Sequence, residues 1–66
     1  MNSEQLRDAH GRLLGTISRI SNGTLHARDA VGTLLGWYDP RANETRDGFG
    51  KLLGRGNSLA TLIAKG

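Results

Sequence analysis

The sequence predicts a mainly β protein, a meander of about six short strands in three hairpin repeats, with a short C-terminal helix. The prediction rests on a nine-residue motif that occurs three times, with six of its nine positions unchanged. In every copy, turn-forming residues precede a short apolar run, which is typical of a β-hairpin. The copies are RDAHGRLLG at 7–15, RDAVGTLLG at 28–36 and RDGFGKLLG at 46–54.

A tight turn opens each repeat. An Asp at the start of a type I turn accepts hydrogen bonds from backbone N–H groups two residues further on, and a Gly at the end adopts a positive φ without a steric clash. Together they close a hairpin through a bulge that needs the glycine. The turn residues predicted in this way are Asp8, Gly11, Asp29, Gly32, Asp47 and Gly50.

The two leucines after each turn predict a short strand, in which neighbouring side chains point to opposite faces. Both faces of the sheet therefore need cover, one from the chain's own core and the other from a second layer or another subunit. The Gly that ends each motif marks a bend or a close backbone approach. The strands are expected at about 4–7, 12–20, 24–28, 33–38, 43–46 and 51–55.

Two further turns join the repeats. The segment SNGT at 21–24 contains Asn-Gly, the strongest short hairpin signal. The segment YDPRAN at 38–43 contains Asp-Pro followed by polar residues, which indicates a wider loop. Both connections are short, as a meander requires.

The last segment, 57–65, departs from the repeat. Leu59, Leu62 and Ile63 have helical i, i+3, i+4 spacing, but a helix of about seven residues is stable only if it docks on something. We therefore predict a docking helix that lies against the repeat sheet, either its own or that of a neighbouring subunit. The alternation of Leu59, Thr61 and Ile63 also fits a last strand. Candidates to cap and end the helix are Asn57 or Ser58 and Gly66.

The length limits how the chain can be stabilised. Its 66 residues form one domain, 1–66, and a domain of this size buries only about 60% of the surface of its unfolded chain. Disulfides, a metal or oligomerisation are the usual supports for so small a fold. The sequence contains no Cys, and its two His are isolated, so we predict no metal site and no cofactor. Oligomerisation is the support that is left.

Charge and hydropathy favour a cytoplasmic protein. Nine Lys and Arg against six Asp and Glu give a net charge of +3, which fits a nucleic-acid binder and equally an Arg-rich bacterial domain. No segment reaches the roughly 18 apolar residues of a membrane span. The polar start, MNSEQLRD, has no apolar signal-peptide region. We expect no membrane partner.

The pattern D-x-x-G-[RTK]-x-L-G, repeated about every 20 residues, resembles the small bacterial β-flower repeat proteins. The resemblance extends from Leu6 to Gly56 and implies a meander of short hairpins that assembles around a symmetry axis. Two features depart from the simplest pattern: the copies are spaced by 21 and then 18 residues, and the tail is not a repeat. The family offers no catalytic residues to carry over to this chain.

The sequence also lacks the groupings that enzymes use. Three of its six acidic residues are the turn Asp residues, which already have a structural role. His10 stands where the other copies have Val31 and Phe49, so the turn needs no imidazole, and His26 has no evident partner. Nucleotide-binding and zinc-protease motifs are also missing. We predict a protein that is not an enzyme and has no evident small-molecule substrate.

Each Arg before a turn Asp also needs an explanation. Because neighbouring residues in a strand point apart, Arg7 is not expected to pair with Asp8. We expect it to reach the Asp of an adjacent hairpin, Asp29 or Asp47. Exposed pairs of this kind contribute about 0–1 kcal/mol.

The main functional prediction is therefore homo-oligomeric assembly, with a partner that is another copy of the chain. The predicted interface residues are Leu59, Leu62, Ile63 and Trp37. The alternative is a nucleic-acid-binding β-module with a basic face and stacking aromatics. Its predicted residues are Arg12, Lys51, Arg55, Trp37 and Tyr38. A weaker alternative is a small inhibitor or accessory protein that binds another protein through its apolar tail.

Overall fold

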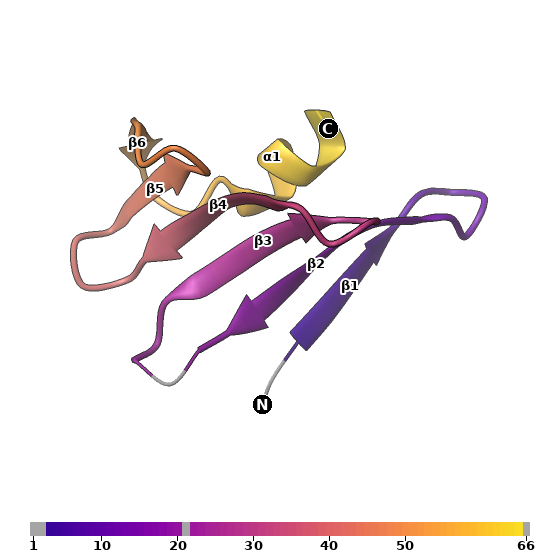
Figure 1. Cartoon of the computed structure of the whole chain (residues 1–66), viewed down its shortest axis with the longest axis horizontal. Coiled ribbons are helices and arrows are strands. Elements are labelled where there is room, and N and C mark those ends of the chain that lie inside the picture. Colours follow the sequence, from indigo (N-terminus) through magenta and orange to yellow (C-terminus); the bar gives the residue numbers. More distant parts are fainter. Residues whose placement is uncertain (1–2, 21, 66) are drawn as a thin grey trace.

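Six antiparallel strands form one sheet in chain order, and one helix follows them (Figure 1). The computed structural model describes residues 3–20 and 22–65. This confirms the predicted meander, and every strand agrees with its predicted range to within one residue at each end. The elements are β1 Ser3–Arg7, β2 Leu13–Arg19, β3 Leu25–Asp29, β4 Leu34–Asp39, β5 Glu44–Asp47, β6 Leu52–Arg55 and α1 Leu59–Lys65.

The three repeat turns share one geometry. In each, the Gly N–H donates to the Asp carbonyl oxygen, and the Asp Oδ1 accepts from the N–H groups two and four residues further on. The ladder register shifts next to each of these turns, as a bulge requires. The φ angles are 82° at Gly11, 95° at Gly32 and 89° at Gly50. These positive values agree with the turn chemistry read from the sequence.

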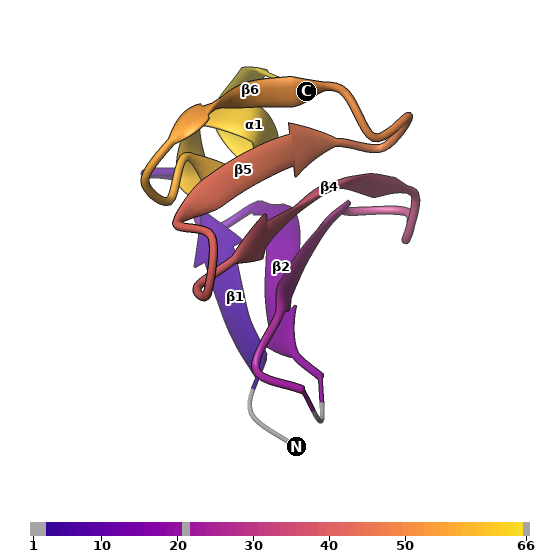
Figure 2. The ribbon, with the colours of Figure 1, turned by 90° about the vertical axis from the view of Figure 1, so that its left-hand side faces the viewer.

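The sheet is strongly twisted, so β1 and β2 run in a clearly different direction from β5 and β6 (Figure 2). Helix α1 lies on one face, where it packs against β2, β3 and β4. We call this the front face and the opposite one the back face. Because consecutive hairpins of a meander point to opposite ends, the three repeat turns lie at one end of the sheet. The connection between β2 and β3 and the connection between β4 and β5 lie at the other end.

Small residues on the front face let the helix approach closely. A Cβ atom added at Gly15 would lie 2.8 Å from Ile63 Cγ2 and would collide with the carbonyl oxygen of Arg28. One added at Gly36 would lie 2.8 Å from Leu62 Cδ1 and would collide with the carbonyl oxygen of Arg46. The close approach predicted for the motif-ending glycines is therefore present in the first two repeats.

The core is small and lies between α1 and the middle strands. Its fully buried apolar residues are Ala27, Leu59 and Ile63. A ring of partly buried side chains surrounds them: Leu6, Ile17, Leu25, Leu35, Tyr38 and Leu62. The helix prediction is confirmed and the alternative of a last strand is wrong, because the helical spacing places Leu59 and Ile63 together on the sheet.

Thr45 joins the start of the helix to the sheet. Its fully buried side chain donates a hydrogen bond of 2.6 Å to the Gly56 carbonyl and accepts one of 3.0 Å from the Ser58 N–H. Asn57 Oδ1 accepts from the Leu59 N–H at 3.0 Å, so Asn57 provides the side-chain cap. The predicted end of the helix, Gly66, lies outside the described residues.

Candidate functional site

The strand registers assign the side chains of the back face. Residues that face each other in adjacent strands lie on the same side of the sheet. The back face is the side that α1 does not cover. One continuous row crosses all six strands with Trp37 near its middle. The row consists of Ser3, Ser18, His26, Trp37, Arg46 and Leu52.

The Arg of each repeat forms a side-chain hydrogen bond to its own turn. Nη1 donates to the turn Gly carbonyl at 2.9 Å for Arg7, 2.9 Å for Arg28 and 2.8 Å for Arg46. The predicted contact between Arg7 and an Asp of a neighbouring hairpin is therefore wrong. The Asp side chains accept from backbone N–H groups of their own turns, and the register shift brings each Arg opposite the first Leu of its motif.

The second nitrogen of these Arg side chains distinguishes the second repeat. Arg7 Nη2 donates to Gln5 Oε1 at 3.1 Å, and Arg46 Nη2 donates to Glu44 Oε1 at 3.5 Å. The equivalent position in the second repeat is His26, and no such bond links it to Arg28 among the residues that the structure describes. In the described part of the chain, His26 therefore differs from Gln5 and Glu44 in having no structural bond to the Arg of its repeat.

A groove runs along the back face beside Trp37, between β3 and β4. Polar side chains line it from the start of β3 to the end of β4: Asn22, Thr24, His26 and Asp39. Ile20 also lines it, and Leu34 closes the end next to the repeat turns. We call this the Trp37 groove. Its polar residues were not predicted, although the difference between the second repeat and its neighbours at His26 and Trp37 could have indicated them.

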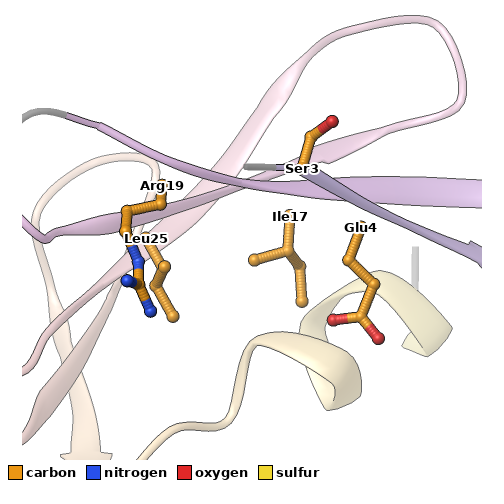
Figure 3. Close-up of a pocket in the computed structure, with 5 residues that line it drawn as sticks. All are labelled: Ser3, Glu4, Ile17, Arg19 and Leu25. Atoms are coloured by element: carbon orange, nitrogen blue, oxygen red, sulfur yellow. The ribbon is translucent and has the colours of Figure 1, made fainter. Parts of the chain in front are cut away.

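A second hollow lies on the front face near α1. Ile17 and Leu25 form its apolar part, and the oppositely charged Glu4 and Arg19 flank them. Figure 3 shows these four side chains on the side of the sheet that faces α1, with Ser3 pointing away. The hollow thus combines apolar side chains with one charge of each sign.

The residues predicted for nucleic-acid binding do not form one surface. Trp37 lies on the back face, whereas Tyr38 packs on the front face against the core and donates to Asn43 Oδ1 at 2.7 Å. Arg12 and Lys51 close two different turns through their backbone N–H groups. The remaining member, Arg55, ends the edge strand β6, and none of these basic residues lines the Trp37 groove.

The residues predicted for an oligomer interface are also divided. Leu59 and Ile63 are covered by the chain's own sheet, which leaves them little surface for a second subunit. Leu62 is half-buried and lines a hollow with Leu53 of β6. Trp37 lies on the opposite face of the sheet. An interface role for these residues stays a prediction, and Leu62, which lies beside Leu53, and Trp37 are the members that remain accessible.

Several large apolar side chains are exposed in the repeats. At the turn tips, Phe49 is 98% exposed and Val31 is 87% exposed. Phe49 also borders a hollow lined by Leu34 and Leu35 of the second repeat. Within the described residues, the exposed large apolar side chains are Leu14, Val31, Phe49, Leu52 and Leu53, of which the last three belong to the third repeat.

Two features are absent from residues 3–20 and 22–65, a metal-binding cluster and a membrane-spanning helix. These residues contain no cluster of three or more His, Cys, Asp or Glu side chains that could hold a metal ion. Nor does this part of the chain include a helix that is long and apolar enough to cross a bilayer.

Comparison with known proteins finds no family model that matches this chain, and no curated protein or solved structure that is similar to it.

Proposed function

We propose that this chain is a non-enzymatic bacterial repeat module whose main activity is homo-oligomeric assembly in the cytoplasm. The observation that carries the proposal is its excess surface. The chain exposes 4587 Å², whereas a folded monomer of 7.1 kDa is expected to expose about 4,100 Å². The difference of about 500 Å² equals one partner's share of the smallest biological interfaces, which bury about 1,000 Å² in total.

The distribution of apolar residues supports the same proposal. Among the described apolar residues, only Ala27, Leu59 and Ile63 are fully buried, while five large side chains are exposed. A monomer would leave Phe49 and Val31 almost entirely in water, although the turns use only the backbone N–H groups of these residues. Assembly would bury them and would supply the support that so small a core needs. The resemblance to β-flower repeats, which implies assembly around an axis, points in the same direction.

The turn tips provide a matched test. His10, Val31 and Phe49 occupy the same position in the three turns, and each contributes its backbone N–H to the turn. A double variant with Val31→Ser and Phe49→Ser should therefore keep the turns while removing the apolar tips. His10→Ser is the control, since it changes the same position without removing an apolar group.

Light scattering coupled to size exclusion would measure the solution mass of the three proteins. We expect a multiple of 7.1 kDa for the parent chain and for His10→Ser, and a shift toward monomer for the double variant. A parent chain that remains monomeric up to about 1 mM, the weak end of measurable association, would rule out the proposed function. An unchanged oligomer in the double variant would show that the interface is not at the tips and would point to Leu53 and Leu62 instead.

A further inference from the structure

The second repeat differs from the other two on the back face, at two positions that touch the same groove. Where the first and third repeats have Gln5 and Glu44, the second has His26. Where they have Thr16 and Arg55 after the motif, the second has Trp37. The two replacements face each other across β3 and β4, and both line the Trp37 groove. The facing pair differs in every repeat, Gln5 with Thr16, His26 with Trp37 and Glu44 with Arg55, and the second repeat is the one that pairs an imidazole with an indole.

Trp37 extends to the turn of the third repeat, where a Cβ atom added at Gly50 would lie 3.9 Å from Trp37 Cη2. Gln5 and Glu44 each accept a bond from the Arg of their repeat, whereas His26 makes no such bond with Arg28 among the described residues. Trp37 is half-buried on a face that no helix of the described chain covers. The indole is therefore available as a flat apolar surface next to an imidazole whose ring nitrogens make no hydrogen bond within residues 3–20 and 22–65.

The other lining groups add donors and acceptors around this surface. Asn22 uses Oδ1 to accept from the Thr24 N–H, which leaves its amide NH₂ as a donor. Asp39 uses Oδ1 to accept from the Arg41 N–H, which leaves Oδ2 as an acceptor. These groups come from the residues just before β3 and from the end of β4, so the groove has its polar groups together with Ile20 at one end and Leu34 at the other.

The charge of the groove selects among ligand classes. Its described lining includes the Asp39 carboxylate and no Lys or Arg. Arg46 faces Trp37 from β5, but its two Nη atoms already donate to the Gly50 carbonyl and Glu44 Oε1. This disfavours a phosphate group, because anions need cationic or N–H partners. The lining also mixes donors with acceptors, and a hydroxyl group satisfies both because it acts as both. A pyranose ring combines such hydroxyls on its rim with an apolar C–H face that can stack on an indole.

We propose that the Trp37 groove binds one pyranose ring of a neutral oligosaccharide. The C–H face of the sugar stacks on Trp37, and its hydroxyls bond to His26, Asn22 and Asp39. The groove is open at the surface, which suits a ring within a longer saccharide. This inference does not depend on the proposed assembly, because all of the lining residues come from one chain.

Tryptophan fluorescence tests the site directly, since Trp37 is the only Trp in the chain. The parent protein is titrated with cellotetraose, laminaritetraose and chitotetraose up to about 10 mM, which covers millimolar dissociation constants. We expect a saturable change in Trp37 emission with at least one of the three. Its dependence on concentration should be the same at low and high salt, because no charged group of a neutral sugar is involved.

Matched variants separate recognition from folding. His26→Ala should weaken binding about three- to tenfold, the effect of losing one hydrogen bond. Gln5→Ala removes the equivalent residue of the first repeat and should leave the affinity unchanged. Trp37→Ala should abolish binding, measured through backbone amide chemical shifts because the fluorescent residue is gone. The same spectra show whether each variant is folded.

Three results would overturn the proposal. The first is no emission change with any of the three sugars. The second is saturable binding of a dT₁₀ oligonucleotide that weakens steeply with salt, with no sugar response, which would assign the groove to nucleic acid. The third is an emission change on dilution alone, again with no sugar response, which would place Trp37 in a subunit interface. Light scattering on the same samples reports assembly separately.

Discussion

The second and third repeats share one motif but have different surroundings. Gly36, which ends the motif in the second repeat, lies under Leu62 of α1, whereas a Cβ atom added at Gly54 of the third repeat would meet no described atom within 4 Å. Leu35 packs against the core, while Leu53 at the equivalent position is 46% exposed. The motif therefore determines the hairpin, and the position of α1 determines which repeats contribute to the core.

The largest expected effect comes from weakening the buried contact between α1 and the sheet. Leu59→Ala removes a fully buried side chain from the contact between α1 and the sheet. Core truncations of this kind lower the free energy of unfolding by about 2–5 kcal/mol. Urea unfolding followed by circular dichroism measures the change. A loss below about 1 kcal/mol would mean that α1 contributes little to stability.

Gly36→Ala should have the next largest effect. The added Cβ collides with the Arg46 carbonyl and lies 2.8 Å from Leu62 Cδ1, and such overpacking costs about 1–3 kcal/mol. A double-mutant cycle with Leu62→Ala, measured by urea unfolding, identifies which contact dominates. We expect the pair of substitutions to be less destabilising than the two single effects added together. Strictly additive changes in the free energy of unfolding would show that Leu62 does not contact the Cβ atom added at position 36.

Thr45→Val examines the connection between the third repeat and the helix. Valine keeps the shape but removes the hydroxyl that bonds to the Gly56 carbonyl and the Ser58 N–H. Leaving those groups unpaired in a buried position costs about 1–3 kcal/mol. Thermal unfolding measures the loss, and Thr45→Ser, which keeps the hydroxyl, should recover most of it. Equal losses for both substitutions would show that the methyl group of Thr45 contributes as much to stability as its hydroxyl.

The Arg bond in the uncovered repeat should have a smaller effect. Arg46→Met keeps an unbranched stem but removes the bond from Nη1 to the Gly50 carbonyl, which is worth about 0.5–1.5 kcal/mol. Amide hydrogen exchange at Gly50 reports the opening of that turn. Arg7→Met removes the equivalent bond of the first repeat and should accelerate exchange at Gly11 by a similar factor. If neither substitution changes the exchange rate, the Arg side chains do not stabilise these turns and the Asp side chain of each turn is sufficient.

The smallest expected effect is in the exposed part of the third repeat. Leu53→Ala truncates a side chain that is 46% exposed, so the free energy of unfolding of the monomer should fall by less than about 1 kcal/mol. The same substitution should weaken assembly, because Leu53 and Leu62 border one hollow. Unfolding measured at low and high protein concentration separates the two effects. A large loss at low concentration would mean that Leu53 belongs to the monomer core.

The sequence was sufficient for the hairpins because their causes are local. Asp29 and Gly32 form their turn through hydrogen bonds within five residues, so the motif alone predicts it. The helix was one of two interpretations, because Leu59 and Ile63 fit both periods until their docking on the sheet selects one. Tertiary contact rather than propensity made that choice.

The candidate site was harder to predict because it depends on which residues face each other. Trp37 and Tyr38 are adjacent in sequence and look like an aromatic pair, yet alternation along β4 puts them on opposite faces. His26 looked isolated because its partner in space, Trp37, follows it by eleven positions and faces it only through the register of β3 and β4. The bonds of Arg28 and its counterparts to the turn carbonyls depend on the bulge, which the motif does not reveal.

The tips of the repeat turns have a consequence for how such a chain can vary. The residue at each tip contributes only its backbone N–H to the fold, and His10, Val31 and Phe49 show that an imidazole, an aliphatic and an aromatic side chain are all accepted there. Mutations at these positions can therefore accumulate at little thermodynamic cost, since the Asp and Gly residues hold the backbone. One end of the sheet thus carries three substitutable positions on a fixed scaffold, an arrangement on which new specificities can evolve, or be grafted, independently of folding.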